Sequence, residues 1–316
     1  MTFEIGGRVL IIFSDPGGAK PLLSYISLNK QIANFLVISD RIYDFYTDFH
    51  IPVLAYKSGM EIDTIASFKP DIVFTGTSYT SKLELRFIQE AKLRGILTYS
   101  FIDHYTSFVE RFRLGTELIY PDNVCVIDQT ALNIAVECAI PVPIIITGNF
   151  YHQFLTAWEP LLSKSAFLRQ SGIDKSQKII VFAPDPLRNV GGIEKFGLDE
   201  KSVLDEVLQV LSTFQRQDIT LIVKAHPNQK EGVLDIKADG VNTMSAECFH
   251  TNTLLAHADL VIGIFSNILI EASILKTSVI RCLIGLNQPD PFNAIQVGSI
   301  ARTRKELGAL VKFNID

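Results

Sequence analysis

Short apolar blocks rich in β-branched residues recur along the chain, separated by segments long enough to hold a helix. The blocks are apolar at nearly every position rather than at alternate ones, which is typical of strands in a parallel sheet that helices cover on both faces. A first series contains six blocks, at residues 9–13, 35–39, 72–75, 97–102, 123–126 and 144–147. A second series contains four, at residues 178–183, 220–223, 260–264 and 278–282. The pattern predicts an α/β chain with two Rossmann-like, doubly wound parallel-sheet domains.

A segment without strand character separates the two series. It begins at the Thr-Gly-Asn tripeptide 147–149 and continues through Trp158, Pro160 and a polar stretch at residues 163–176. A chain of 316 residues suits two ordinary domains, because single hydrophobic cores stop growing near about 250–300 residues. We therefore expect a boundary near residue 160, with residues 1–158 in one domain and residues 159–316 in the other.

The segments between the blocks are compatible with helices, for example at residues 81–93, 201–214 and 268–275. Ligands of open α/β sheets bind at the carboxyl ends of the strands. We therefore expect the two domains to face a cleft, and we look for chemistry in the loops that follow the strands.

Composition excludes several classes of protein. Hydrophobic residues make up 47% of the chain and charged residues 20%, which is too apolar for a disordered chain. The net charge of -5 argues against a protein that coats nucleic acid, so no nucleic-acid partner is expected. The four cysteines stand singly, which indicates neither a disulfide framework nor a zinc ribbon and favours a reduced, cytoplasmic setting. No run approaches the roughly 18–20 apolar residues of a membrane-spanning helix, and the run 9–13 is too short for a secretory signal.

The loop after the first block reads SDPGGAK at residues 14–20. Its glycines would let backbone N–H groups approach an anion at a helix N-terminus, where the helix dipole favours negative charge. Asp15, Gly17 and Gly18 are therefore candidates for substrate binding. The spacing is not GxGxxG, and a tight turn with no ligand is the alternative.

Asp103 and His104 follow the apolar block 97–102. A carboxylate at that position, flanked by an imidazole, could act as general base on an acceptor hydroxyl, so Asp103 is a candidate catalytic residue and His104 a candidate substrate-binding residue. The alternatives are that Asp103 caps a following helix and that His104 is structural.

Arg188 lies in the glycine-containing loop 182–192 that follows the first block of the second series. An arginine in such a loop could grip a phosphate with two parallel hydrogen bonds. A surface loop with a solvated arginine explains the same pattern.

Lys224 and His226 follow the block at residues 220–223. Alternate residues of a strand share a face, so two groups able to carry positive charge would converge where the sheet edge opens. They could stabilise a phosphate leaving group, which makes His226 a candidate catalytic residue and Lys224 a candidate substrate-binding residue. A structural role for the pair is the alternative.

Ser266 and Asn267 lie where the block 260–264 gives way to a helix, and Glu271 follows about one turn later. Backbone donors at such a helix start can hold a phosphate, and the carboxylate could accept hydrogen bonds from ribose hydroxyls.

At these residues the chain resembles the GT-B superfamily, the two-Rossmann architecture of many nucleotide-sugar glycosyltransferases and of the UDP-N-acetylglucosamine 2-epimerases. KAHPNQ at 224–229 resembles the HP motif of bacterial sialyltransferases, Kdo transferases and CDP-glycerol glycerophosphotransferases. SNILIEA at 266–272 resembles the serine-then-glutamate stretch that holds phosphate and ribose. The tripeptide 147–149 stands where TGN closes the first domain of the epimerases.

The resemblance implies an acceptor-side domain at residues 1–158 and a nucleotide-sugar-binding domain at residues 159–316. It implies that His226 binds the donor phosphate, supported by Ser266 and Asn267, that Glu271 contacts the ribose, and that Asp103 stands near the catalytic carboxylate of the first domain. No resident cofactor is implied, because the nucleotide sugar is a co-substrate.

Three segments depart from the epimerase pattern. SDPGGAK replaces a GTRPE-like turn, Gly76-Thr77 replaces a glycine-aspartate pair, and APDPLRN at 183–189 replaces a loop rich in histidine and arginine. The departures favour glycosyl transfer over epimerisation.

We therefore expect a GT-B-type glycosyltransferase that uses a CMP-, CDP- or UDP-linked sugar in surface polysaccharide or glycoconjugate biosynthesis. The alternatives are an epimerase-like or hydrolysing enzyme and a non-catalytic nucleotide-sugar-binding protein. No DxD pair stands at a strand end, so transfer is expected to be metal-independent, with Lys224, His226 and helix dipoles in place of a cation.

The acceptor is expected to be a glycan or a lipid-linked molecule. The run 108–113 alternates aromatic and charged residues and could face an acceptor or the inner face of a membrane, giving a peripheral association. A solvated helix face is the alternative for this run.

Overall fold

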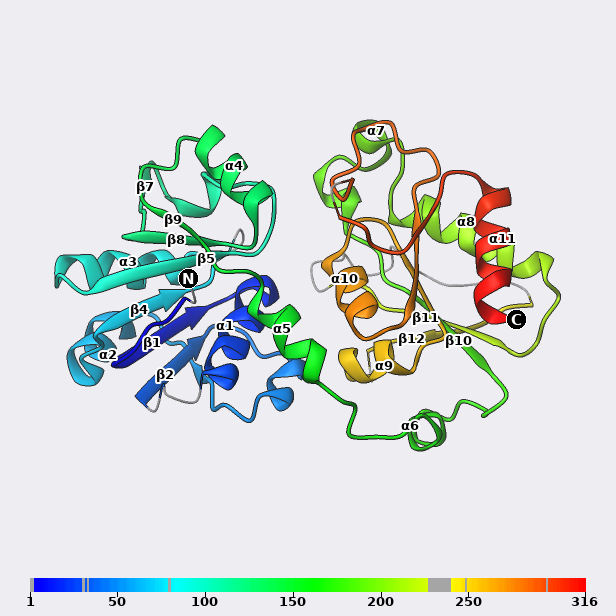
Figure 1. The fold of residues 1–316 in the computed structure, drawn as a ribbon, viewed down its shortest axis with the longest axis horizontal. Helices are drawn as coiled ribbons and strands as arrows, with labels where there is room; N and C mark the ends of the chain where they lie inside the picture. The colour runs from blue at the N-terminus through cyan, green and yellow to red at the C-terminus, as the bar shows by residue number, and fades with distance from the viewer. Residues whose placement is uncertain are drawn as a thin grey trace. The chain divides into compact units, whose positions relative to one another are not determined.

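The computed structural model describes residues 3–29, 32, 34–78, 81–226, 240–247, 249–293 and 295–316. The chain divides into two compact units, Met1–Ala157 and Trp158–Asp316. Each unit is built on one parallel sheet with helices packed on both of its faces (Figure 1).

The sheet of the first unit has seven strands in the order β3-β2-β1-β4-β5-β8-β9, and every neighbouring pair is parallel. The strands are β1 (Arg8–Phe13), β2 (Asn34–Ser39), β3 (Leu54–Ala55), β4 (Ile72–Thr75), β5 (Leu97–Ile102), β8 (Asn123–Val126) and β9 (Ile144–Ile146). The strand order reverses between β1 and β4. This point is where ligands bind in doubly wound sheets.

Helices cover both faces of this sheet, which explains why its strands are apolar throughout. The helices are α1 (Pro16–Leu28), α2 (Met60–Phe68), α3 (Leu83–Leu93), α4 (Gln129–Glu137) and α5 (Phe150–Ala157). Leu10 and Ile12 of β1 pack with residues of α2 and α3 on one face. On the other face the rings of Phe74, Tyr25 of α1 and Phe150 of α5 lie against one another. Shorter elements complete the unit: the 3-10 turns η1 (Asp44–Asp48) and η2 (Glu110–Phe112) and the hairpin β6 (Arg113–Leu114) with β7 (Glu117–Leu118).

The sheet of the second unit has six strands in the order β12-β11-β10-β13-β14-β15, again all parallel. The strands are β10 (Lys178–Phe182), β11 (Ile219–Val223), β12 (Asn242–Ser245), β13 (Leu260–Gly263), β14 (Ser278–Cys282) and β15 (Ser299–Ala301). Here the order reverses between β10 and β13.

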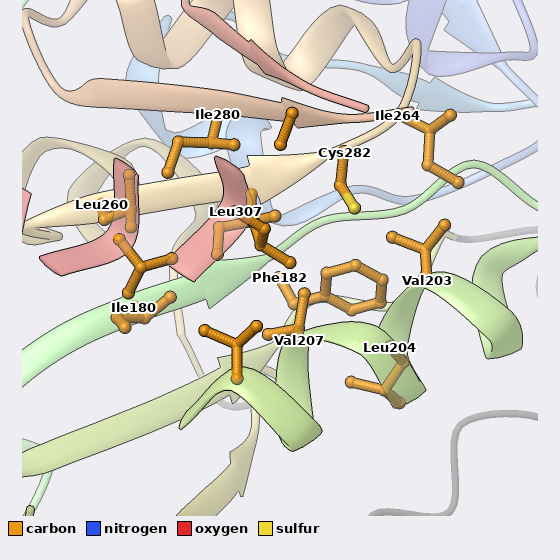
Figure 2. Packing of buried hydrophobic residues seen from close by; sticks show 14 of the residues in the cluster. Ile180, Phe182, Val203, Leu204, Val207, Leu260, Ile264, Ile280, Cys282 and Leu307 are labelled. Carbon is orange, nitrogen blue, oxygen red and sulfur yellow. The ribbon is translucent and has the colours of Figure 1, made fainter. Parts of the chain in front are cut away.

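The second unit has a continuous core on each face of its sheet. The helical elements are α6 (Lys164–Gln170), η3 (Leu187–Val190), α7 (Gly192–Phe196), α8 (Glu200–Thr213), α9 (Thr251–His257), α10 (Asn267–Ile274) and α11 (Arg304–Ile315). Figure 2 shows one core, in which Phe182 of β10 packs with Val203 and Val207 of α8 and with Leu307 of α11. The other core joins α6, α9 and α10 to the opposite face.

The predicted fold class is confirmed: both halves are doubly wound parallel sheets. All ten predicted blocks form strands, and no strand end differs from its prediction by more than one residue. The prediction missed the short strands β3, β12 and β15 and the hairpin β6–β7. These elements have two to four residues each, and β12 reads Asn-Thr-Met-Ser, which lacks an apolar block.

None of the helices in the described part of the chain is both long and apolar enough to cross a membrane.

Candidate functional site

The loops that follow β1, β4 and β5 meet where the strand order of the first unit reverses. A Cβ atom on Gly18 would lie 2.8 Å from Cα of Gly76, so the backbones of the two loops touch. A Cβ atom on Gly17 would lie 1.8 Å from Oδ2 of Asp103. The structure thus brings together Gly17, Gly18 and Asp103, which the sequence assigned to one sheet edge.

Asp15 lies at the N-cap of α1 but does not cap the helix with its side chain. Its carboxylate instead accepts hydrogen bonds from Nη1 of Arg41 at 2.8 Å and from the Ser78 hydroxyl at 2.7 Å. Arg41 follows β2 and Ser78 follows β4, so the carboxylate of Asp15 connects the loops after β1, β2 and β4. Arg41 and Ser78 are not among the predicted site residues; their position just after two apolar blocks is the signal that points to them.

Asp103 forms an ion pair with Arg111, whose Nη1 lies 3.0 Å from Oδ1. Only 13% of the Asp103 side chain and 11% of the Arg111 side chain are exposed. Nη1 of Arg111 also reaches the carbonyl oxygen and the hydroxyl of Thr77, at 3.0 and 3.2 Å. Asp103 does not cap a following helix, because turns rather than a helix follow it. It rests instead on the first turn of α1.

The ring of His104 is partly buried beside this ion pair. Its Nδ1 lies 3.1 Å from the hydroxyl of Thr106. Burial lowers the pKa of His104 below its usual value; the charge of Arg111 acts in the same direction and that of Asp103 opposes it. The lowered pKa favours the neutral form of the imidazole.

Glu84 is a buried acid at this edge that the sequence analysis missed. It lies in the first turn of α3, is 2% exposed, and accepts the N–H of Ser14 at 2.9 Å. Burial raises the pKa of its carboxyl to about 8, and the nearby charges of Asp15 and Asp40 add to the shift. The Ser14 hydroxyl is buried without a hydrogen-bond partner in the described structure. Nothing in the sequence distinguishes Glu84 from an exposed helix residue.

The run 108–113 was expected to face an acceptor or a membrane surface, and for its aromatic residues this expectation is wrong. Phe108 and Phe112 are buried in the core formed with Val124 and Val126. They therefore face neither an acceptor nor a membrane surface. The solvated-helix alternative also fails, because the run forms the short turn η2 and enters β6, and Arg111 pairs with Asp103.

In the second unit, the loops after β10 and β13 also meet where the strand order reverses. Oδ2 of Asp185 accepts the N–H of Phe265 at 2.8 Å, which fixes the turn just before Ser266. Burial raises the pKa of Asp185 to about 6, with Glu200 adding to the shift and Arg281 opposing it. Gly263 is required for this approach, because a Cβ atom there would lie 2.5 Å from the carbonyl oxygen of Ala183.

Ser266 occupies the N-cap of α10, and Asn267 is its first residue, as the sequence analysis expected. The Ser266 side chain makes no capping bond to the helix, and both residues are partly exposed. The Ser266 hydroxyl is thus not used to cap α10, while its carbonyl oxygen accepts the N–H of Leu269 at 3.0 Å. Glu271, in the second turn, is buried.

Lys224 and His226 follow β11 at the same edge. The N–H of Lys224 bonds the carbonyl oxygen of Phe182 at 2.8 Å, which extends the pairing of β11 with β10 by one residue. Both side chains are partly exposed. The rest of the HP-like motif, Pro227 and Asn228, lies outside the described residues.

Arg188 is half exposed and lies in η3. Its Nε is 3.7 Å from Oδ2 of Asp199, and its backbone N–H bonds Glu200 at 3.0 Å. Asp199 and Glu200 begin α8, so the arginine is tied to the start of that helix rather than simply solvated.

Within the described residues, no three His, Cys, Asp or Glu side chains gather so that they could hold a metal ion. Asp290 pairs with Arg281, and Asp316 pairs with Arg216. Cys125 and Cys282 are buried and Cys138 is exposed, each as a free thiol; Cys248 lies outside the described residues.

No protein-family model matches the sequence, and no curated protein matches it in sequence. Solved structures do resemble it in fold. The UDP-GlcNAc 2-epimerase from Methanocaldococcus jannaschii has a TM-score of 0.66 at 15% identity, over 98% of this chain and 93% of that one. The UDP-GlcNAc 2-epimerase from Neisseria meningitidis bound to UDP-GlcNAc has a TM-score of 0.65 at 14% identity, over 97% and 91%. The glycotransferase of kitacinnamycin has a TM-score of 0.56 at 12% identity, over 99% and 92%. The chain therefore has the two-Rossmann fold of the GT-B type.

Proposed function

We propose that this protein binds a nucleotide sugar and transfers its glycosyl group to an acceptor hydroxyl. One edge of the second unit carries the proposal: Ser266 stands at the start of α10 without capping it, beside a turn that Asp185 fixes. Fold likeness supports it, because structures that bind UDP-GlcNAc or UDP align with nearly the whole chain.

The donor phosphate would lie at the N-terminus of α10. The Ser266 hydroxyl and the backbone N–H groups would donate to it, and the helix dipole would favour its negative charge. Asn267 would support the phosphate, Lys224 and His226 would add positive charge, and Glu271 would accept from the ribose.

Transfer needs a base for the acceptor hydroxyl and a group that stabilises the departing nucleotide. The Asp103–His104 segment at the end of β5 would supply the base, and the loop at Gly17 and Gly18 would line the acceptor side. Lys224, His226 and the dipole of α10 would take up charge on the nucleotide phosphate, so the reaction would need no metal ion.

The second candidate is an epimerase or a hydrolase that uses the same donor site. The fold likeness to UDP-GlcNAc 2-epimerases favours it. The replaced segments 14–20, 76–77 and 183–189 favour transfer instead.

Incubation with nucleotide sugars separates the candidates. UDP-GlcNAc, a CMP-linked sugar and CDP-glycerol would each be supplied with and without a panel of glycan and lipid-linked acceptors. We expect nucleotide release that depends on acceptor. Release or a sugar isomer formed without acceptor would favour the second candidate, and binding without turnover would indicate a non-catalytic nucleotide-sugar-binding protein.

The biological setting that fits this chemistry is assembly of surface polysaccharide or glycoconjugate at the cytoplasmic side, with the protein free or peripherally attached to the membrane. Fractionation of cells and analysis of surface glycans in a deletion strain test this part of the proposal.

A further inference from the structure

We propose that His104, through Nε2, takes the proton of the acceptor hydroxyl, and that Thr106 and Arg111 hold its ring in the required state. Asp103 is then a positioning residue rather than the base. The inference rests on the proposed function and names the base within it.

One carboxylate oxygen of Asp103 is engaged in the ion pair, and the other lies against the backbone of Gly17. Oδ1 accepts from Arg111 at 3.0 Å, and Oδ2 is packed so closely on Gly17 that a Cβ atom there would lie at 1.8 Å. A base must reach the proton it removes within hydrogen-bond distance. Oδ1 is engaged by the guanidinium and Oδ2 lies against Gly17, whereas Nε2 of His104 has no hydrogen-bond partner among the described residues.

Arg111 is held in one place by several acceptors. Besides Asp103 it reaches two oxygens of Thr77, and its Nε lies 3.4 Å from the carbonyl oxygen of Thr106. Burial is the main factor that lowers the pKa of His104 and disfavours its imidazolium form; the charge of Asp103 opposes this effect, and the fixed charge of Arg111 adds to it. A neutral ring at working pH is the form that accepts a proton.

The turn after β5 places Thr106 against the ring. Ser107 adopts φ 59°, a left-handed conformation that non-glycine residues rarely take. This turn brings the Thr106 hydroxyl 3.1 Å from Nδ1 of His104. When Nδ1–H donates to that hydroxyl, the lone pair of the neutral ring lies on Nε2. No described residue bonds Nε2, so it remains available to an acceptor.

In the step, the acceptor O–H gives its proton to Nε2 and its oxygen forms a bond to the anomeric carbon of the donor sugar. The bond from that carbon to the phosphate oxygen breaks, and its electron pair leaves with the nucleotide. The imidazolium then returns its proton to solvent, so no oxidant, reductant or further reactant is needed.

The state of the ring can be measured without substrate. Long-range ¹⁵N–¹H correlation spectra of the full chain resolve six histidines, and His104→Gln identifies the signal of residue 104. We expect a neutral Nδ1–H tautomer at pH 7. Thr106→Val should shift the ring toward the Nε2–H tautomer, whereas Thr106→Ser should preserve the original state.

The same spectra followed against pH test the charged neighbours. Arg111→Gln should raise the titration midpoint of His104, and Asp103→Asn should lower it, because the two charges act in opposite directions. An Nε2–H tautomer or an imidazolium at pH 7 in the unaltered protein would overturn the inference.

Turnover supplies the second test, measured as nucleotide release from the active member of the donor panel. His104→Gln should lower kcat by about 10²–10⁴-fold with little change in the KM for donor. The acidic limb of the kcat profile should move to higher pH in Arg111→Gln. His50→Asn, at an exposed histidine of the same unit, should leave kcat unchanged.

Retention of more than a tenth of kcat in His104→Gln would overturn the assignment. An acidic limb of the kcat profile that stays at the same pH in Arg111→Gln would also overturn it. If the unaltered protein turned over no nucleotide sugar, the proposed function would fail, and the spectra alone would still decide the state of the ring.

Discussion

Asp103 fills the space that a side chain at Gly17 would need. Its Oδ2 lies 1.8 Å from the position of a Cβ atom built on that glycine. The carboxylate therefore rests on the first turn of α1, where the helix dipole is positive and favours it. This contact joins the loop after β1 to the loop after β5.

Gly17→Ala should disrupt that contact. The new methyl group must push Asp103 or the helix aside, and overpacking of this kind typically costs about 1–3 kcal/mol. Chemical unfolding should show a loss of stability in that range, with altered signals of His104. Gly6→Ala is the control, because nothing lies within 4 Å of a Cβ atom there. Equal stability of the two variants would contradict the described contact.

Glu84→Gln should make the protein more stable at neutral and alkaline pH. The pKa of Glu84 is raised from 4.5 to about 8 in the folded state. Between these values the folded protein holds a proton that the unfolded chain lacks, so stability falls as pH rises through this window. The variant keeps an oxygen for the N–H of Ser14 and removes the titration. The free energy of unfolding of the variant should exceed that of the unaltered protein by a few kcal/mol at pH 8, and the difference should vanish near pH 4.

Urea unfolding at several pH values measures this difference. Glu137→Gln, at an exposed position of α4 in the same unit, should show no such dependence. A Glu84→Gln curve parallel to that of the unaltered protein from pH 4 to pH 9 would show that the buried acid is not protonated.

Asp290→Asn should destabilise the second unit strongly. Arg281 and Asp290 form an ion pair with side chains only 1% and 5% exposed, and Arg281 also stacks on Phe292. Removing one charge leaves the other buried without compensation, which costs about 3–5 kcal/mol. Glu206→Gln breaks the more exposed pair with Arg304 and should cost at most about 1 kcal/mol. Similar losses in both variants would contradict the burial of the first pair.

Chelation should leave turnover unchanged. In the proposed reaction Lys224, His226 and the dipole of α10 act where a divalent cation would otherwise stabilise the departing phosphate. Activity measured after dialysis against EDTA should equal that before, and recovery only upon adding Mg²⁺ or Mn²⁺ would show that a metal ion takes part.

The sequence predicted the central strands well for a physical reason. Strands such as β1 and β11 are buried on both faces, so every position is apolar and the block is visible without any partner. Edge strands such as β12 and β15 bury little and carry polar residues, so their pairing depends on the neighbouring strand rather than on composition.

The site was predicted only in part. Asp103 and Gly17 could be assigned to one sheet edge because Asp103 directly follows an apolar block and Gly17 lies in the short loop that follows another. Arg111 could not, since it reaches Asp103 across a turn whose path depends on Ser107 in a left-handed conformation. Glu84 lies in an ordinary helical sequence, and only the packing of α3 under β1 buries it. The roles of Lys224, His226, Ser266, Asn267 and Glu271 toward a donor, and the likeness of 224–229 to the HP motif, stay predictions.

Ser266→Ala should weaken nucleotide binding. A hydrogen bond from the hydroxyl to a charged phosphate is worth about 1.5–3 kcal/mol, so Kd should rise roughly 10- to 100-fold. Ser273→Ala, at an exposed position of the same helix, is the matched control and should bind normally. A Kd that changes equally in both variants would place the phosphate elsewhere.

Titration calorimetry of the full chain with UDP, CMP, CDP and GDP tests the central claim most directly. We expect at least one of these nucleotides to bind at a single site, with affinity reduced in Ser266→Ala and preserved in Ser273→Ala. Absence of binding by all four, or binding that Ser266→Ala leaves untouched, would contradict a nucleotide-sugar site at the start of α10.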